Sequence, residues 1–138
     1  HTLFETSLSS AFIISVPDKK KGVENNRIVS SIDIYPTLME LCGVELPDGL
    51  EGRSFVSLLD SPDDENWEDI AYSYFRNGIS MRTTRYRMSK YFASENNVTE
   101  LYEYKQDIFE RKNMANEKPE IINELMSLWE KGNTFCYK

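Results

Sequence analysis

Hydrophobic residues form one short continuous run near the start of the chain. Residues 11–16 read A-F-I-I-S-V and are closed by Pro17, a pattern typical of a strand that is covered on both faces. Strands of this kind usually lie inside a parallel sheet, and no series of alternating strands and helices precedes this one. We therefore expect the neighbours of this strand to belong to a sheet outside the chain.

Two helices are predicted next. Residues 28–43 indicate a helix and its entry, with Asp33 as the N-terminal cap, Pro36 in the first turn and Gly43 as a left-handed stop. One face of this helix is apolar: Ile34, Leu38, Leu41 and Cys42. Ser54 is the predicted cap of a shorter helix whose apolar side follows directly: Phe55, Leu58 and Leu59. The acidic, turn-rich residues 61–69 then separate two structural zones.

The second zone has the alternation of strands. Strands are predicted over residues 70–75, 79–88, 90–93 and 100–104, with Asn77-Gly78 as a hairpin turn. Simple alternation fails within residues 79–88, so a bulge is expected near Thr83 and Thr84. A last helix begins at Pro119 and ends at Gly132. Its apolar stripe consists of Ile121, Ile122, Leu125, Leu128 and Trp129.

These elements indicate an α+β fold in two parts. Residues 1–62 are interpreted as the remnant of a larger α/β domain, with one strand and a helix. Residues 63–138 are interpreted as a small antiparallel sheet of about four strands, packed with the C-terminal helix.

Composition excludes several classes of protein. The 138 residues are 40% hydrophobic and 28% charged, as in an ordinary folded domain, and the net charge of −7 opposes binding to nucleic acid or anionic membranes. No apolar run approaches the ~20 residues that a membrane span needs. Cys42 and Cys136 form no metal-binding cluster, and Cys42 is interpreted as a small core residue rather than half of a disulfide.

Five collinear segments resemble the C-terminal part of type I sulfatases, in the alkaline phosphatase-like superfamily. They are H-T-L-F-E at residues 1–5 with F-I-I-S-V-P at 12–17, S-I-D-I-Y-P-T-L at 31–38 with E-L-C-G at 40–43, G-R-S-F at 52–55, G-I-S-M-R-T-T-R-Y-R at 78–87, and E-L-Y at 100–102 through Asp107, Glu110 and Asn113. The last two are most similar to the iduronate-2-sulfatase-like branch. Ser9-Ser10-Ala11 and Asp107-Ile108 depart from the family pattern of Arg-Val-Pro and Asp-Pro.

The resemblance also implies what this chain lacks. The family's nucleophile is a Cys or Ser in a Cys/Ser-x-Pro-x-Arg motif that is oxidised to formylglycine, and calcium is held by residues earlier in the chain. Neither cysteine here fits that motif, and the only histidine is His1. We therefore expect no catalytic residue, metal ligand or cofactor in this chain, with calcium and formylglycine in a preceding part of the parent protein. Alone, the chain is predicted to be inactive.

The resemblance places His1 one residue after the family's active-site lysine, and hence near the substrate. Glu5 is expected to fix the turn that follows, by binding backbone or a basic neighbour. Two interpretations remain open for Arg82 and Arg85, which belong to a cluster of five basic residues between positions 76 and 90. The cluster either forms a positive surface that orients a sulfated sugar or pairs with Glu100, Glu103 and Asp107.

Two hypotheses for function follow. In the first, the chain closes the fold of a sulfatase that hydrolyses sulfated saccharides and contributes pocket wall, and its partner is the remainder of the parent, which is exported as in the family. In the second, it is a stand-alone, non-catalytic module that binds anionic polysaccharide. In either case residues 11–16, without their sheet, predict self-association, strand exchange or packing against the second half of the chain.

Overall fold

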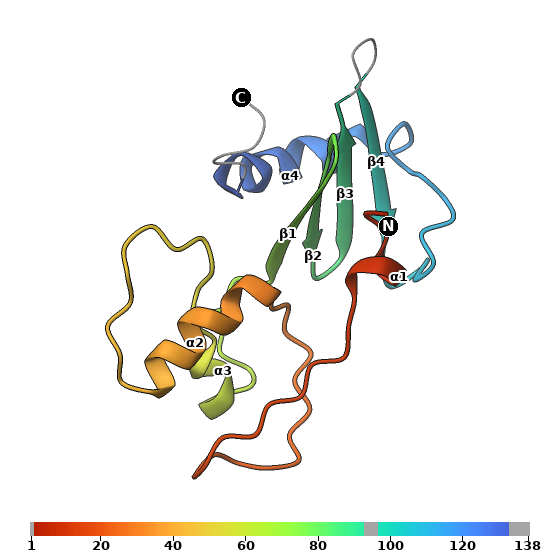
Figure 1. The fold of residues 1–138 in the computed structure, drawn as a ribbon. Helices are drawn as coiled ribbons and strands as arrows, with labels where there is room; N and C mark the ends of the chain where they lie inside the picture. Colours follow the sequence, from red (N-terminus) through yellow and green to blue (C-terminus); the bar gives the residue numbers. More distant parts are fainter. Residues whose placement is uncertain (1, 93–96, 133–138) are drawn as a thin grey trace. The chain divides into compact units, whose positions relative to one another are not determined.

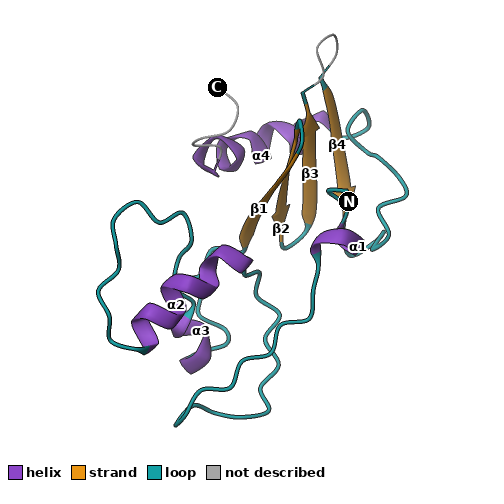
Figure 2. Ribbon diagram, in the orientation of Figure 1, coloured by secondary structure: helices purple, strands orange, loops and turns teal. Residues whose placement is uncertain are grey.

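The computed structural model describes residues 2–92 and 97–132, and it divides into two compact units. One unit is Ala11–Ala71, and the other joins His1–Ser10 to Tyr72–Lys138. Together they make a small α+β structure with a few helices, a four-stranded antiparallel sheet and a C-terminal helix, which confirms the predicted fold class (Figure 2). The predicted division between residues 62 and 63 concerns domains of a longer parent and stays a prediction.

The predicted strand over residues 11–16 is wrong. This segment has no secondary structure, because no strand among the described residues pairs with it. Phe12 instead packs edge-on against Phe55, with ring centroids 5.7 Å apart, and Ile14 packs on the small core of Phe55, Leu58 and Trp67. The side chain of Ile13 is 92% exposed.

The first helix of this unit is entered through Asp33. A 3-10 turn at Ser31–Asp33 leads into α2, Ile34–Leu41. The Asp33 carboxylate accepts hydrogen bonds from the N–H groups of Ser30 (2.8 Å) and Arg53 (2.9 Å), and not from a first-turn N–H as the sequence suggested. Asp33 therefore ties the helix entry to the loop that precedes α3, Val56–Asp60.

The end of α2 is formed by Gly43. Its φ of 65° lies in the left-handed region, where glycine has no steric penalty, and the N–H of Val44 reaches back to the carbonyl of Met39 (2.9 Å). Pro36 and Thr37 are the buried residues of this helix. Cys42 is exposed, so its prediction as a core residue is wrong: no described residue buries it at the end of α2. Cys136 lies outside the described residues.

The sheet belongs to the second unit and has the order β1-β2-β3-β4 (Figure 1). Its strands are β1 (Ile70–Phe75), β2 (Gly78–Thr83), β3 (Tyr86–Tyr91) and β4 (Val98–Glu103). The prediction of one bulged strand over residues 79–88 is wrong, because the chain reverses at Thr84 and Arg85. Thr83 closes this turn, since its hydroxyl accepts the N–H of Tyr86 (3.1 Å) and donates to the Tyr86 carbonyl (3.0 Å). Ala93, the end of the third predicted strand, lies outside the described residues.

Helix α4, Pro119–Gly132, begins at the predicted Pro119, and it packs on the apolar face of the sheet, where Lys90 contacts Met126 and Trp129. Ile79, Met81, Met88 and Leu101 point to this face and are fully buried. Leu125 and Trp129 are the buried residues of the helix, and the Tyr72 hydroxyl donates to the Leu128 carbonyl (2.6 Å). A short helix, α1 (Glu5–Leu8), belongs to the same unit. Among the described helices none has the length and apolar content to cross a membrane.

The hydroxyl of Thr37 gives a test of how α2 and α3 are joined. It donates to the Asp33 carbonyl (2.6 Å) and accepts the buried N–H of Phe55 (3.0 Å). Replacing Thr37 by Val should lower the free energy of unfolding of this unit by about 1–3 kcal/mol, since the Phe55 N–H loses its partner. Hydrogen exchange of the α3 amides measures this loss. Thr37→Ser keeps the hydroxyl and is the matched control; equal protection in the Val and Ser variants would contradict the prediction.

Candidate functional site

The two faces of the C-terminal sheet differ in chemistry. Arg82 lies opposite Arg87 across β2 and β3, and Arg87 lies opposite Tyr102 across β3 and β4. Side chains alternate between the faces of a strand, so these residues share the face opposite α4. The face also carries Gly78, Ser80, Ser89, Tyr91 and Glu100. It is therefore polar, although much of it is buried.

Arg87 is the centre of this polar face. Its Nε donates to Glu110 Oε1 (2.6 Å), its Nη1 to Ser80 Oγ (2.9 Å) and its Nη2 to Glu5 Oε2. The side chains of Arg87 and Glu110 are only 3% and 2% exposed. A buried charge is tolerated when it is paired and its remaining donors are bound, and Arg87 meets both conditions.

Glu5 enters the network from the other end of the chain. Its own N–H donates to Glu110 Oε2 (2.7 Å), and Arg82 Nε lies 3.3 Å from Glu5 Oε2. Two guanidinium groups thus face two carboxylates, and their charges balance. Figure 1 shows α1, which begins at Glu5, beside the strands of this sheet.

Glu110 has a strained backbone conformation, in which its carboxylate binds Arg87 and the N–H of Glu5. Its φ of 52° lies in the left-handed region, which costs a non-glycine residue about 1–3 kcal/mol. Such strain persists where the surrounding structure determines the conformation, and here two hydrogen bonds to the Glu110 carboxylate do so.

The loop after β4 is stabilised by two further polar side chains. Asp107 Oδ2 accepts the N–H groups of Arg111 (2.5 Å) and Lys112 (2.8 Å). Asn113 Oδ1 accepts the N–H groups of Leu101 (3.0 Å) and Ala115 (2.9 Å), which covers part of the edge of β4. Asp107, Glu110 and Asn113 thus each hold one part of this loop.

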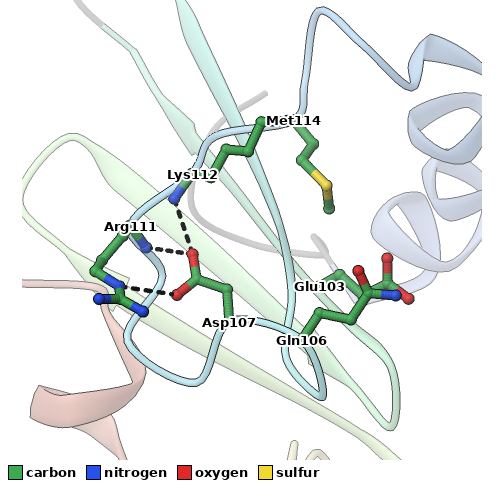
Figure 3. A pocket seen from close by; sticks show the side chains of 6 residues that line it. All are labelled: Glu103, Gln106, Asp107, Arg111, Lys112 and Met114. Atoms are coloured by element: carbon green, nitrogen blue, oxygen red, sulfur yellow. Dashed lines mark hydrogen bonds and ion pairs between the residues drawn. The ribbon is translucent and has the colours of Figure 1, made fainter.

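A pocket of about 330 Å³ lies beside the same loop (Figure 3). It is lined by Glu103, Gln106, Asp107, Arg111, Lys112 and Met114. Arg111 lies 3.5 Å from the Asp107 carboxylate, and Lys112 Nζ donates to Glu117 (2.8 Å), so the lining cations already have carboxylate partners. The pocket therefore offers little unmatched charge to a ligand.

The residues predicted to lie near a substrate are only partly placed together. His1 lies outside the described residues. The Arg82 guanidinium carbon lies 3.9 Å from the centre of the Tyr104 ring, and Arg82 Nη1 is buried without a hydrogen-bond partner among the described residues. Arg85 is 61% exposed and pairs with Glu103 through Nη2 (2.8 Å). Arg82 and Arg85 therefore reach different carboxylates, and neither pairs with the predicted Glu100 or Asp107.

Carboxyl groups on the two faces of β4 have opposite pKa shifts. The Glu103 carboxylate accepts hydrogen bonds from Arg85 and Lys118, which lower its pKa. Burial raises the pKa of Glu100, and the negative charge of Glu110 adds to this effect. Burial and the Glu100 carboxylate likewise raise the pKa of the Tyr102 hydroxyl.

The Arg87 network is the feature that sequence reasoning missed. In the sequence, Arg87 is one of the five basic residues between positions 76 and 90, and its partner Glu5 is 82 positions away. Treating residues 79–88 as one strand also hid it, because positions 82 and 87 of a single strand are separated along its length and cannot be cross-strand neighbours. The turn at Thr84 and Arg85 puts them side by side.

The described residues contain no cluster of metal-binding side chains. Among residues 2–92 and 97–132, no group of three or more His, Cys, Asp or Glu side chains could hold a metal ion. The buried charges are held in mutual pairs, which suits them to fixing the chain rather than to transferring a proton or group.

The opposite pKa shifts of Glu100 and Glu103 predict that replacing each carboxyl group by an amide changes stability in opposite directions at pH 7. Glu103→Gln should destabilise the sheet at pH 7, and the loss should vanish at acidic pH. The pKa of Glu103 is lower in the folded state than its unfolded-state value of ~4.3, so the ionised carboxylate stabilises the fold above pH ~4.3. This stabilisation is lost as the pH falls through the folded-state pKa. Glu100→Gln should stabilise at pH 7 and have no effect below ~4.3, because a raised pKa favours the protonated form. Urea midpoints from pH 3 to 8 measure both; parallel pH profiles would contradict this prediction.

Comparison with known proteins gives the family. Residues 1–133 match the family model described as N-sulphoglucosamine sulphohydrolase, C-terminal. Arylsulfatase K of Danio rerio is 29% identical over 137 residues, which cover 92% of this chain and 26% of that protein. An ulvan-active sulfatase of Formosa agariphila is 38% identical over 64 residues, covering 45% of this chain and 12% of that protein.

Solved structures agree on the fold. A 2-O GAG sulfatase is 28% identical with a TM-score of 0.58, covering 72% of this chain and 23% of its own. A protein in complex with its substrate D-glucosamine-2-N,6-O-disulfate has a TM-score of 0.64 at 24% identity, covering 80% of this chain and 26% of its own. The chain thus spans about a quarter of the length of these relatives. It belongs to the family of N-sulphoglucosamine sulphohydrolase C-terminal regions, and so is the C-terminal region of a type I sulfatase.

Proposed function

We propose that this chain completes the fold of a sulfuric ester hydrolase that acts on a sulfated saccharide. In this proposal it supplies structural closure and part of the wall of the substrate pocket, and a preceding part of the parent supplies the nucleophile and the metal site. The observation that carries the proposal is the family match over residues 1–133.

The relatives support the substrate class. Their names include a sulfatase active on ulvan and a 2-O GAG sulfatase, and one solved relative holds a disulfated glucosamine as its substrate. On these grounds we propose that the parent of this chain also acts on a sulfated saccharide. Within this class we propose the iduronate-2-sulfatase-like branch, from the segments at residues 78–87 and 100–113.

Exposed apolar side chains support the proposal that the remainder of the parent is the partner of this chain. On α2, Tyr35 and Leu38 are 49% and 50% exposed. They are three residues apart and therefore lie on the same side of the helix. A preceding part of the parent would cover this side, and the isolated chain is expected to self-associate through such surfaces.

The alternative of a module that binds anionic polysaccharide has less support. Such a module needs unmatched positive charge, yet Arg82, Arg85 and Arg87 all pair with carboxylates. The net charge of −7 adds to this objection.

The proposal is tested with the full-length parent protein. Its coding sequence upstream of His1 should contain a Cys/Ser-x-Pro-x-Arg segment, and the purified protein with calcium should release sulfate from sulfated saccharides. The parent with Ala at the Cys or Ser of that segment is the matched control and should release none. An upstream sequence without the segment, or a full-length protein that releases no sulfate from a panel of sulfated saccharides, would refute the proposal.

Arg85 provides a test of the proposed pocket wall. In the full-length protein, Arg85→Gln should raise KM for the sulfated saccharide about 10–150-fold, the range for losing one hydrogen bond between charged groups, with little change in kcat. Arg111→Gln is the control, because Arg111 is also exposed (79%) and paired with a carboxylate. Equal KM values for both variants would show that Arg85 only pairs with Glu103.

A further inference from the structure

The segment that leads into α1 is bound to the polar face of the sheet at three successive residues, the last of which is the first residue of the helix. Leu3 is 1% exposed, and its Cδ1 lies so close to Gly78 that a Cβ there would be 2.7 Å away. The ring of Phe4 meets the ring of Tyr102 edge-on, with centroids 5.9 Å apart. Glu5 makes the ionic contacts with Arg87 and Arg82. These contacts join the N-terminal segment to β2, β3 and β4.

The apolar and ionic contacts have different consequences. Burial of Leu3 and Phe4 stabilises the segment, but it is non-directional and would tolerate a shift along the sheet. Buried ion pairs add little net stability, since desolvation offsets their attraction, and their best-attested role is to fix a register. The ionic contacts of Glu5 therefore determine where the segment lies.

From this geometry we propose that Arg87 is a positioning residue, which holds Glu5 and thereby sets the position of the residues that precede it. The importance for catalysis rests on the proposed function, in which His1 follows the active-site lysine of the parent. In this role Arg87 touches no substrate. It connects the C-terminal sheet to the chain that enters the active site, and it acts through Glu5.

The guanidinium group is required for this role. Arg87 uses Nε, Nη1 and Nη2 on Glu110, Ser80 and Glu5, three partners in three directions. A lysine has the same charge but a single nitrogen, which cannot bridge the two carboxylates with the same geometry. The backbone N–H of Glu5 also binds Glu110, so the pair of carboxylates and Arg87 act as one unit.

Hydrogen exchange of this chain tests the positioning directly. In wild type, the N–H groups of Ser7, Leu8 and Ser9 are bonded within α1, and that of Glu5 is bonded to Glu110. Arg87→Lys should speed exchange at these four amides by at least ~10-fold, as expected for losing charge-assisted hydrogen bonds, while amides of β3 and β4 change by less than ~3-fold. Arg111→Lys is the control, because its arginine is exposed and pairs only within the loop after β4. Wild-type exchange at the α1 amides in Arg87→Lys would overturn the proposal.

Two further variants cover the case in which Arg87→Lys does not fold. Glu5→Gln keeps the shape of residue 5 and removes its charge, and it should speed exchange in α1 to a similar extent. Gly78→Ala places a methyl group against Leu3 and the Tyr91 ring without altering any charge, and it should speed exchange at α1 less than Glu5→Gln does. If Gly78→Ala has the larger effect, apolar packing positions the segment and the proposal is wrong.

Kinetics of the full-length parent separate positioning from stability. Arg87→Lys should lower kcat for sulfate release at least ~10-fold with KM within ~3-fold, since a displaced catalytic segment affects the reaction more than substrate binding. Unchanged kcat together with fast exchange at α1 would overturn the positioning role. A wild-type parent without activity would refute the proposed function, and the exchange experiment would still decide whether Arg87 holds the segment.

Discussion

The C-terminal unit depends on the pairing of the buried Arg87 guanidinium group with the carboxylates of Glu5 and Glu110. Arg87 needs two carboxylates and a hydroxyl, and the structure takes them from β2, from the loop after β4 and from residue 5. Removing any one partner would leave a buried charge or donor unmatched, which costs far more than the pair contributes. Three other features accompany the buried guanidinium group of Arg87. They are the left-handed backbone of Glu110, the small side chains of Ser80 and Ser89, and the attachment of Glu5.

This constraint explains why one compact unit is built from both ends of the sequence. Each face of the sheet is covered by another segment of the chain, and the two segments differ in chemistry. The apolar face, with Met81 and Met88, is covered by α4 through Trp129 and Leu125. The polar face is covered by residues 3–5, which bring a leucine, a phenylalanine and a carboxylate to a surface of matching chemistry. The residues between these two parts, Ala11–Ala71, form their own unit.

Features with local causes could be predicted from the sequence, and features with distant causes could not. Pro119 begins α4 as predicted, because start signals act within one turn. The predicted cap Ser54 is wrong by one residue: Phe55 is the N-cap of α3, and Ser54 Oγ accepts the N–H of Val56. The turn at Thr84 and Arg85 has no glycine or asparagine signal, so residues 79–88 looked like one strand. The pairing of Glu5 with Arg87 depends on a register that appears only once that turn is known. Residues 11–16 have the composition of a buried strand, but a strand forms only when a neighbour satisfies its backbone, and the described residues contain none.

The two units differ in how completely their apolar residues are covered. The sheet carries covers on both faces within the chain, so its central residues Ile79, Met81, Met88 and Leu101 are fully buried. The unit Ala11–Ala71 buries Phe55, Leu58 and Trp67 but leaves Ile13 exposed, together with Tyr35 and Leu38 on one side of α2. Scattered apolar exposure is ordinary, whereas adjacent half-exposed apolar residues on one side of a helix are the feature on which the proposed contact with the rest of the parent rests. The relatives are about four times as long as the matched region, and a part of that length placed against α2 would give this unit the cover that the sheet already has.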